Sequence, residues 1–187
     1  MNTTHKALIV TDVQNDFITG TLRVPGAETT AVEIAAYLDA HAADYGLVIA
    51  TQDWHQHPGN HWSDEPDYKD SWPKHCEAYS WGAQLHDSLP QIFNTRAFKG
   101  FDKAAYSGFE GRCDGDALLG DYLREHNITE VDIVGIALDH CVKATAMDAQ
   151  EQGFTTRVIT SLTAAVSAKT ADEAVTEMAE AGVEVTE

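Results

Sequence analysis

The sequence predicts an α/β protein of three layers, with a mainly parallel, six-stranded sheet between two layers of helices. Short runs rich in Val and Ile recur along the 187 residues, and they are continuous rather than alternating in polarity. Such runs are typical of strands that are covered on both faces. Helical stretches separate most of these runs, and this alternation requires right-handed crossover connections and parallel strands.

The strand and helix candidates follow one another along the chain. The runs that we interpret as strands span residues 7–11, 47–51, 92–98, 131–138, 157–161 and, with the weakest pattern, 183–185. The stretches that we interpret as helices span residues 28–44, 116–127, 141–152 and 171–181. Gly153 and Gly182 suit the C-terminal ends of the last two helices, and Thr170 suits the N-cap of the final one.

Residues 53–91 do not fit the alternation, because they show little periodicity. The segment contains four Trp and five His residues, which argues against disorder. A long irregular stretch inside a compact domain is usually functional. The sequence therefore predicts a loop that builds a site.

The composition limits the classes of function. A chain of 187 residues can bury a substantial core, so we expect a single domain over residues 1–187. Its net charge of -18 repels phosphate backbones and anionic lipids, so we expect no nucleic-acid or membrane partner. The chain has no signal-peptide layout and no apolar run of about twenty residues. Its three cysteines show no CxxC spacing, which favours a reducing, cytoplasmic location.

Several reactive side chains stand where the predicted strands end. Asp12 follows the first strand, Lys99 ends the third, and Cys141 follows the fourth. Ligands of parallel sheets bind at this edge, so the three can share one crevice. A carboxylate that takes a thiol proton, beside an ammonium, suits nucleophilic catalysis, and a helix start would lower the thiol pKa. Each residue also has an ordinary explanation on its own, as a turn cap, a surface lysine or a buried thiol.

A second group of residues has the types that bind metals. Asp53 and His55 are two positions apart, and His61 and His75 follow in the same irregular segment. One carboxylate and three imidazoles would hold a divalent cation such as Zn²⁺, Fe²⁺ or Mn²⁺. A polar loop with hydrogen-bonded histidines explains the same residues, and the spacing leaves His57 ambiguous.

Two aromatic residues accompany these groups. Phe17 lies shortly after Asp12, and Trp72 shortly before His75. Both can be core residues. If they flank the same crevice as the thiol, they favour a flat ring bound between them.

The segments TDVQNDF, TQDWHQHPGNHW, SWPKHC, FKG, AYSGFEG and GIALDHCVKATAMDA resemble, in this order, the nicotinamidases (pyrazinamidases) of the isochorismatase-like cysteine hydrolases. The resemblance extends from Ala7 to about Val185. It implies the isochorismatase-like fold and hydrolysis of nicotinamide to nicotinate and ammonia through a thioester, as a step of NAD salvage. Pyrazinamide would be a second substrate.

The resemblance also implies a role for individual residues. The implied catalytic triad is Asp12, Lys99 and Cys141. The implied metal ligands, completed by two waters, are Asp53, His55, His61 and His75, which leaves His57 outside the set. The implied substrate pocket has Phe17 and Trp72 around the ring and Tyr106 and His140 as further lining. A cis peptide between Ile136 and Ala137 would direct the N–H groups of Ala137 and Cys141 into an oxyanion hole.

Two other functions are compatible with the sequence. Carbamoyl- and ureido-type amidases share the Asp, Lys and Cys residues but generally lack the four metal ligands. A non-catalytic metal-binding protein could keep the same fold. Two positions depart from the family pattern, namely the single glycine after Phe17 and Leu138, where threonine is common. Neither the metal nor the oligomeric state follows from the sequence.

Overall fold

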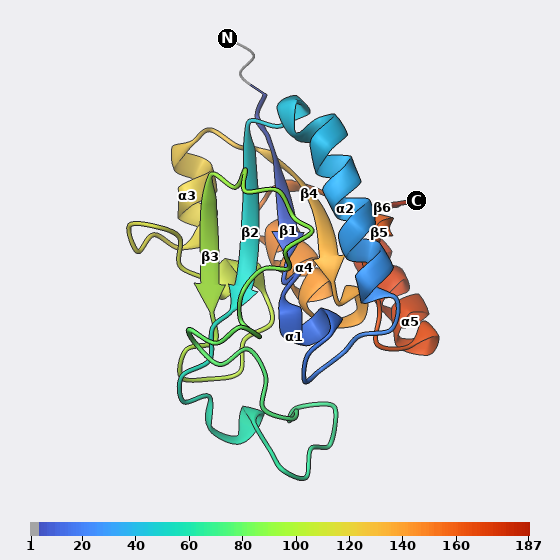
Figure 1. The fold of residues 1–187 in the computed structure, drawn as a ribbon. Helices are drawn as coiled ribbons and strands as arrows, with labels where there is room; N and C mark the ends of the chain where they lie inside the picture. Colours follow the sequence, from blue (N-terminus) through green and yellow to red (C-terminus); the bar gives the residue numbers. More distant parts are fainter. Residues whose placement is uncertain (1–3) are drawn as a thin grey trace.

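A six-stranded sheet forms the middle of the molecule, and all of its strands are parallel (Figure 1). The computed structural model describes residues 4–187. The strands are β1 Lys6–Thr11, β2 Leu47–Asp53, β3 Thr95–Lys99, β4 Glu130–Ile136, β5 Thr155–Ala164 and β6 Glu184–Thr186. Their order across the sheet is β3-β2-β1-β4-β5-β6.

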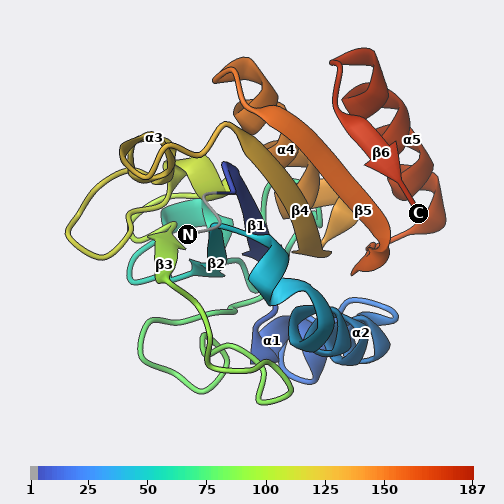
Figure 2. The same ribbon diagram turned by 90° about the horizontal axis from the view of Figure 1, so that it is seen from above.

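Helices cover both faces of the sheet, which confirms the predicted three-layer fold (Figure 2). They are α1 Asn15–Ile18, α2 Ala27–His41, α3 Leu119–Glu125, α4 Lys143–Glu151 and α5 Ala168–Glu180. The helices α1 and α2 pack on one face, and α3, α4 and α5 pack on the other. None of the described helices has both the length and the apolar character needed to cross a membrane.

Several element boundaries differ from those expected. The strand β3 begins at Thr95 rather than at residue 92, and β5 extends to Ala164 rather than to residue 161. The helix α5 begins at Ala168, because Ser167 is its N-cap and accepts a hydrogen bond from the Thr170 N–H at 3.2 Å. The expectation that Thr170 caps this helix is therefore wrong.

The end of β4 also differs from the expectation. The strand stops at Ile136, because a cis peptide joins Ile136 to Ala137 and a single π-helical turn then spans Leu138–Val142. The α-helix starts only at Lys143, so Cys141 lies within the π-turn and not at the first residue of the α-helix. Single π-turns are frequent at functional sites.

The strand order reverses between β1 and β4. From β1 the chain continues to β2 and β3 toward one edge of the sheet, and from β4 it continues to β5 and β6 toward the other edge. In open α/β sheets, the crevice at such a switch point is where ligands bind. Asp12 and Cys141 follow these two strands. The topology thus places a carboxylate and a thiol on either side of that crevice.

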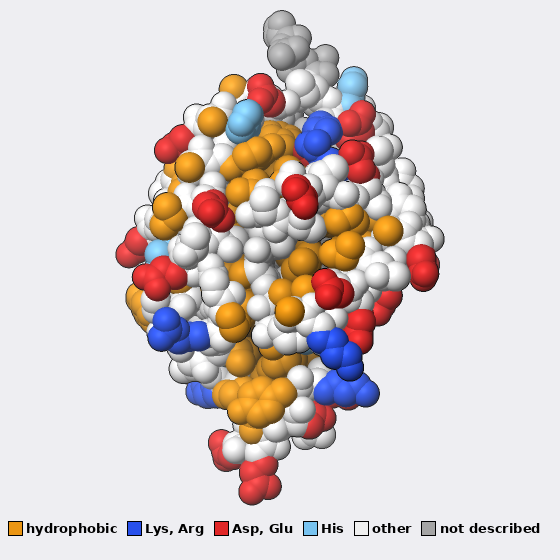
Figure 3. Space-filling model, turned by 90° about the vertical axis from the view of Figure 1, so that its right-hand side faces the viewer, with side chains coloured by type: hydrophobic (Ala, Val, Ile, Leu, Met, Phe, Trp, Pro, Cys, Tyr) orange, Lys and Arg blue, Asp and Glu red, His pale blue; other side chains and the backbone are white. Residues whose placement is uncertain are grey.

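Acidic side chains are spread around the face of the molecule that Figure 3 shows, and apolar side chains run down its centre. On this face the negative charge is therefore not concentrated into one patch. It is consistent with a role in solubility rather than in recognising one partner.

Gly135 allows β4 to approach β1 closely. It has a φ of +118°, and a Cβ there would lie 2.1 Å from the Thr11 carbonyl oxygen. We expect Gly135→Ala to lower the free energy of unfolding by about 2–4 kcal/mol, since strain and overpacking add. Urea denaturation measures this loss. Gly153→Ala is the control, because its φ of +88° is similar but the position is open. Equal losses in the two variants would contradict the argument.

Candidate active site

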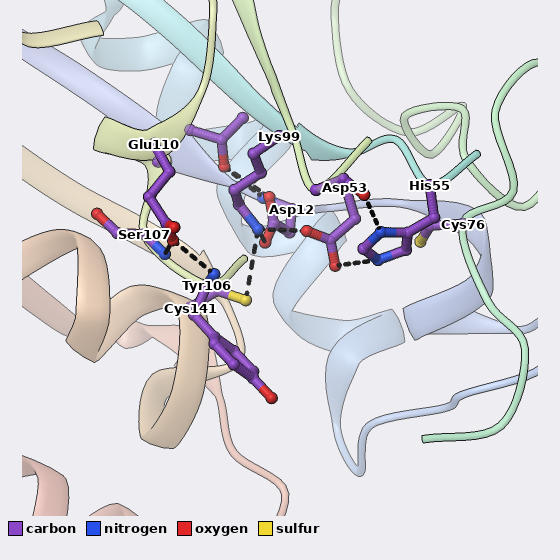
Figure 4. Close-up of polar contacts among 12 residues, drawn as sticks. Asp12, Asp53, His55, Cys76, Lys99, Tyr106, Ser107, Glu110 and Cys141 are labelled. Carbon is purple, nitrogen blue, oxygen red and sulfur yellow. Dashed lines mark hydrogen bonds and ion pairs between the residues drawn. The ribbon is translucent and has the colours of Figure 1, made fainter. Parts of the chain in front are cut away.

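Four buried groups meet at the carboxyl edge of the sheet, namely Asp12 after β1, Asp53 at the end of β2, Lys99 at the end of β3 and Cys141 in the π-turn after β4 (Figure 4). The Lys99 Nζ donates to Asp12 Oδ2 at 2.9 Å, also donates to Asp53 Oδ1, and lies 3.7 Å from Cys141 Sγ. The Thr51 hydroxyl donates to the other oxygen of Asp12 at 2.6 Å. The structure therefore brings together Asp12, Lys99 and Cys141, as predicted, and the Lys99 ammonium lies between the other two side chains and Asp53.

Burial dominates the ionisation of this cluster. It raises the pKa of Asp12, even though the Lys99 ammonium opposes the shift. Burial alone would lower the pKa of Lys99, but Asp12 and Asp53 hold it well above its usual range. The lysine is thus a fixed cation between two carboxylates.

The Cys141 thiol does not have the lowered pKa that its place after β4 suggested. Burial raises its pKa well above the usual range, and the attraction of Lys99 is outweighed by that burial together with the charges of Asp12 and Asp53. The resting nucleophile is therefore a protonated thiol. A carboxylate oxygen of Asp12 lies within 4.8 Å of Sγ and can accept its proton during attack.

The π-turn frees backbone N–H groups near the thiol. The Ala137 carbonyl accepts the N–H groups of His140 and Val142 at 3.0 Å, but not that of Cys141. Within residues 4–187, the Ala137 N–H has no hydrogen-bond acceptor. The two N–H groups expected to form the oxyanion hole are therefore not engaged by the Ala137 carbonyl or, for Ala137, by any other described acceptor.

Three histidines of the irregular segment form a second cluster next to the first. One nitrogen each of His55, His61 and His75 lies within 4.8 Å of the others. Asp53 Oδ2 is 3.6 Å from His55 Nε2 and 3.9 Å from His75 Nε2. Because Asp53 Oδ1 pairs with Lys99, this one carboxylate joins the two clusters.

The histidine cluster has the properties of a metal site. Backbone carbonyls orient two of the rings, since Gly100 O lies 2.6 Å from His55 Nδ1 and Pro73 O lies 2.7 Å from His75 Nδ1. Among the described residues, the buried His55 Nε2 has no hydrogen-bond partner, and its nearest anionic group is the Asp53 carboxylate at 3.6 Å. Burial lowers the pKa of His61 to about 4, so that ring is neutral. Neutral imidazoles with a carboxylate fit a divalent cation.

Asp12, Asp53 and Cys141 also bring potential ligand atoms within 4.8 Å of one another. The Lys99 ammonium already contacts all three groups. A cation held there would meet strong repulsion from the ammonium. We therefore assign the metal to the histidines with Asp53.

A cavity of about 320 Å³ opens onto both clusters. It is lined by Cys141 and Asp53 and by all four aromatic residues expected around a substrate, namely Phe17, Trp72, Tyr106 and His140. The Trp72 Nε1 donates to the Tyr106 hydroxyl at 3.2 Å, which holds the two rings together. Phe17 and Trp72 thus face the same cavity as the thiol, as a ring-binding site requires.

Some residues near the site escaped sequence reasoning. Asp139 accepts the Val166 N–H at 3.0 Å and the Thr170 hydroxyl, and so ties the π-turn to the start of α5. The segment from Leu22 to Pro25 lines the cavity. Neither Asp139 nor this segment belongs to a periodic pattern or a motif that would have indicated its place in the sequence. His57 is exposed and lies outside the histidine cluster, as the resemblance implied.

Comparisons with known proteins agree with this geometry. The sequence model of the isochorismatase domain matches residues 6–187. A nicotinamidase/pyrazinamidase of Mycobacterium tuberculosis is 48% identical over 96% of this chain and 97% of its own length. A pyrazinamidase of Pyrococcus horikoshii in complex with zinc has a TM-score of 0.83, 33% identity and coverage of 98% of this chain and 99% of that one. PnC1 from L. infantum in complex with nicotinate has the same TM-score, 34% identity and coverage of 100% and 94%.

Proposed function

The chain belongs to the isochorismatase family, and we propose that it is a nicotinamidase that hydrolyses nicotinamide to nicotinate and ammonia. The observation that carries this proposal is the meeting of Cys141, Asp12 and Lys99 with a histidine–carboxylate cluster in one aromatic cavity. The similarity to the M. tuberculosis nicotinamidase/pyrazinamidase supports it and extends it to pyrazinamide. The product nicotinate would enter the salvage of NAD, and the three buried, unpaired cysteines suit a reducing cytoplasm.

The first half of the reaction forms a thioester on Cys141. Asp12 takes the proton of the thiol while Sγ attacks the carboxamide carbon. The N–H groups of Ala137 and Cys141 stabilise the oxyanion, each by about 3–4 kcal/mol in comparable sites. Asp12 then gives its proton to the departing ammonia, and its raised pKa suits this role as an acid.

The second half of the reaction regenerates the enzyme. Asp12 takes a proton from water, and the resulting hydroxide attacks the thioester carbonyl. Collapse of the adduct releases nicotinate, and the thiolate recovers its proton from Asp12. Lys99 donates to Asp12 throughout and stabilises the negative charge as it moves between the carboxylate and Sγ.

The remaining side chains bind and orient the ring. Phe17 and Trp72 hold it from either side, and Tyr106 and His140 line the cavity beside it. Asp53, His55, His61 and His75 would hold one divalent cation. When bound, that cation supplies a Lewis-acidic anchor for the ring nitrogen, directly or through a bound water. Zn²⁺, Fe²⁺ and Mn²⁺ all suit these donors.

The assay that tests this function measures ammonia release from nicotinamide by purified, reduced protein supplied with metal. We expect release in step with the appearance of nicotinate. N-carbamoyl amino acids serve as the comparison substrates, since carbamoyl-type amidases use the same Asp, Lys and Cys types. Release from these compounds and not from nicotinamide would reject the proposal.

Removal of a metal ligand is expected to weaken binding of the substrate ring while leaving the Cys141 nucleophile reactive. In His55→Ala, zinc affinity should fall by more than the roughly 10–100-fold that loss of a supporting group costs. The KM for nicotinamide should rise, while Cys141 stays reactive toward iodoacetamide. Equilibrium titration with zinc, followed by kinetics, measures both effects. His57→Ala is the matched control, because His57 is exposed and outside the cluster. An unchanged KM in zinc-free His55→Ala would exclude the anchoring role.

A further inference from the structure

We propose that Asp16 is a positioning residue that fixes the histidine cluster against the ring-binding part of the cavity. Asp16 lies in α1, contributes nothing to the reaction described above, and is only 7% exposed. Its carboxylate accepts the backbone N–H of Thr21, five residues further along the chain, and that of Cys76, in the histidine-bearing loop. This inference concerns the metal site of the proposed function, but its test requires no substrate.

Every polar group of Asp16 is hydrogen-bonded, and the partners lie in three segments, at Thr21 and Leu22, at Cys76 and at Gly82. Its Oδ2 accepts the Cys76 N–H at 2.7 Å, and its Oδ1 accepts the Thr21 N–H at 3.1 Å. Its own N–H donates to Gly82 O at 3.0 Å, and its carbonyl accepts the Leu22 N–H at 3.0 Å. One residue thus links α1, the segment that leads into the cavity lining at Leu22, and the histidine-bearing loop.

Cys76 connects this carboxylate to two metal-ligand candidates. It directly follows His75, and its carbonyl accepts the His55 N–H at 3.0 Å. Cys76 has a φ of +46°, in the left-handed region that residues other than glycine rarely adopt. The bond to Asp16 supports that conformation. Displacing the carboxylate would therefore move the backbone between His75 and His55.

Two glycines show that the carboxylate occupies a fitted slot. A Cβ on Gly82 would lie 2.0 Å from Asp16 Oδ2, and a Cβ on Gly20 would lie 2.3 Å from Oδ1. Neither glycine has a positive φ, so space rather than backbone conformation requires them. The surroundings are thus shaped to hold this carboxylate in one place.

Asp16 also borders the aromatic side of the cavity. The next residue is Phe17, whose ring lies 5.7 Å from that of His75, and the Phe17 carbonyl accepts the Val24 N–H at 2.8 Å. The short helix α1 therefore carries both Phe17, one of the two aromatic residues proposed to bind the substrate ring, and the Asp16 carboxylate that holds the histidine-bearing loop. Metal affinity and ring binding should depend on it together.

The test is a zinc titration of metal-free protein against a chromophoric chelator. We expect Asp16→Asn to weaken zinc binding by about 10-fold or more, the range seen when groups supporting a metal ligand are removed. The asparagine amide has the size of the carboxylate, but its NH₂ group would face the N–H of either Thr21 or Cys76 and cannot accept that hydrogen bond. Gly82→Ala should weaken zinc binding in the same direction, because its Cβ displaces the carboxylate.

A double-mutant cycle separates positioning from general destabilisation. In an Asp16→Ala background the slot no longer contains a carboxylate, so adding Gly82→Ala should change zinc affinity by less than twofold. Additive effects of the two changes would overturn the proposal. The cycle still decides the matter if Asp16→Asn folds poorly, provided that circular dichroism shows Gly82→Ala and the Asp16→Ala pair folded.

Asp132→Asn is the matched control, since Asp132 is also buried but pairs with Arg157 and Tyr45 near the opposite end of the sheet. We expect it to lower the thermal midpoint without changing zinc affinity. If Asp16→Asn keeps wild-type zinc affinity, or if Asp132→Asn weakens zinc binding equally, Asp16 has only a structural role and the proposal fails.

Discussion

Replacing Cys141 with alanine is expected to abolish hydrolysis of nicotinamide while leaving zinc binding intact. Removal of a covalent nucleophile typically lowers kcat by 10⁴-fold or more, because no neighbouring group can form the acyl intermediate. In this chain the nearest alternatives, Asp12 and Asp53, are both held by Lys99. We therefore expect ammonia release below detection. The histidine cluster does not include Sγ, so zinc affinity should stay within about twofold of wild type.

Two further measurements make the Cys141 prediction specific. Wild-type enzyme quenched during turnover should show by mass spectrometry an adduct of the nicotinoyl group on the peptide that contains Cys141. Cys113→Ala is the matched control, because Cys113 is buried and unpaired but lies outside the cavity. Substantial turnover by Cys141→Ala would sink the thioester mechanism, and so would an adduct mapped to Cys113 or Cys76.

The sequence placed the reactive residues correctly because they follow strands. Asp12, Asp53, Lys99 and Cys141 all stand at carboxyl ends of a parallel sheet, and strand periodicity alone indicates that such ends converge. The histidine set came from residue types in one irregular segment, and the resemblance separated His57 from the others. The fold class followed from the same alternation of apolar runs.

Other features depended on tertiary contacts that no local pattern records. The start of α5 was misplaced because Thr170 bonds to Asp139 and leaves the cap to Ser167. The pKa of Cys141 departs from the expected direction because burial, together with the charges of Asp12 and Asp53, outweighs the ammonium beside the thiol. The sequence does not indicate the role of Asp16, because only the fold brings Cys76 to its carboxylate.

The Lys99→Met variant is expected to lose both activity and stability. Lys99 is fully buried, and its removal leaves the Asp12 and Asp53 carboxylates facing each other without a cation. Breaking a buried ion pair in this way costs about 3–5 kcal/mol of folding free energy. Turnover should fall by at least about 10³-fold, since Asp12 would be protonated and unable to accept the thiol proton. Urea denaturation of the metal-free protein and steady-state kinetics measure the two effects.

The stability loss in Lys99→Met should depend on pH in a defined direction. The Asp12 pKa is already raised by burial in the wild type, and without the ammonium it must rise further. A carboxyl group with a folded pKa above its unfolded value of about 3.9 favours folding when protonated, so the deficit should be largest at neutral pH. It should shrink as the pH falls through the raised pKa. Lys6→Met is the control, because Lys6 faces buried Asp132 at 3.4 Å from a partly exposed position, and Arg157 still pairs with that carboxylate. We expect it to cost at most about 1 kcal/mol. A deficit in Lys99→Met that is small, or that grows on acidification, would mean that Lys99 does not hold the two carboxylates in their charged state.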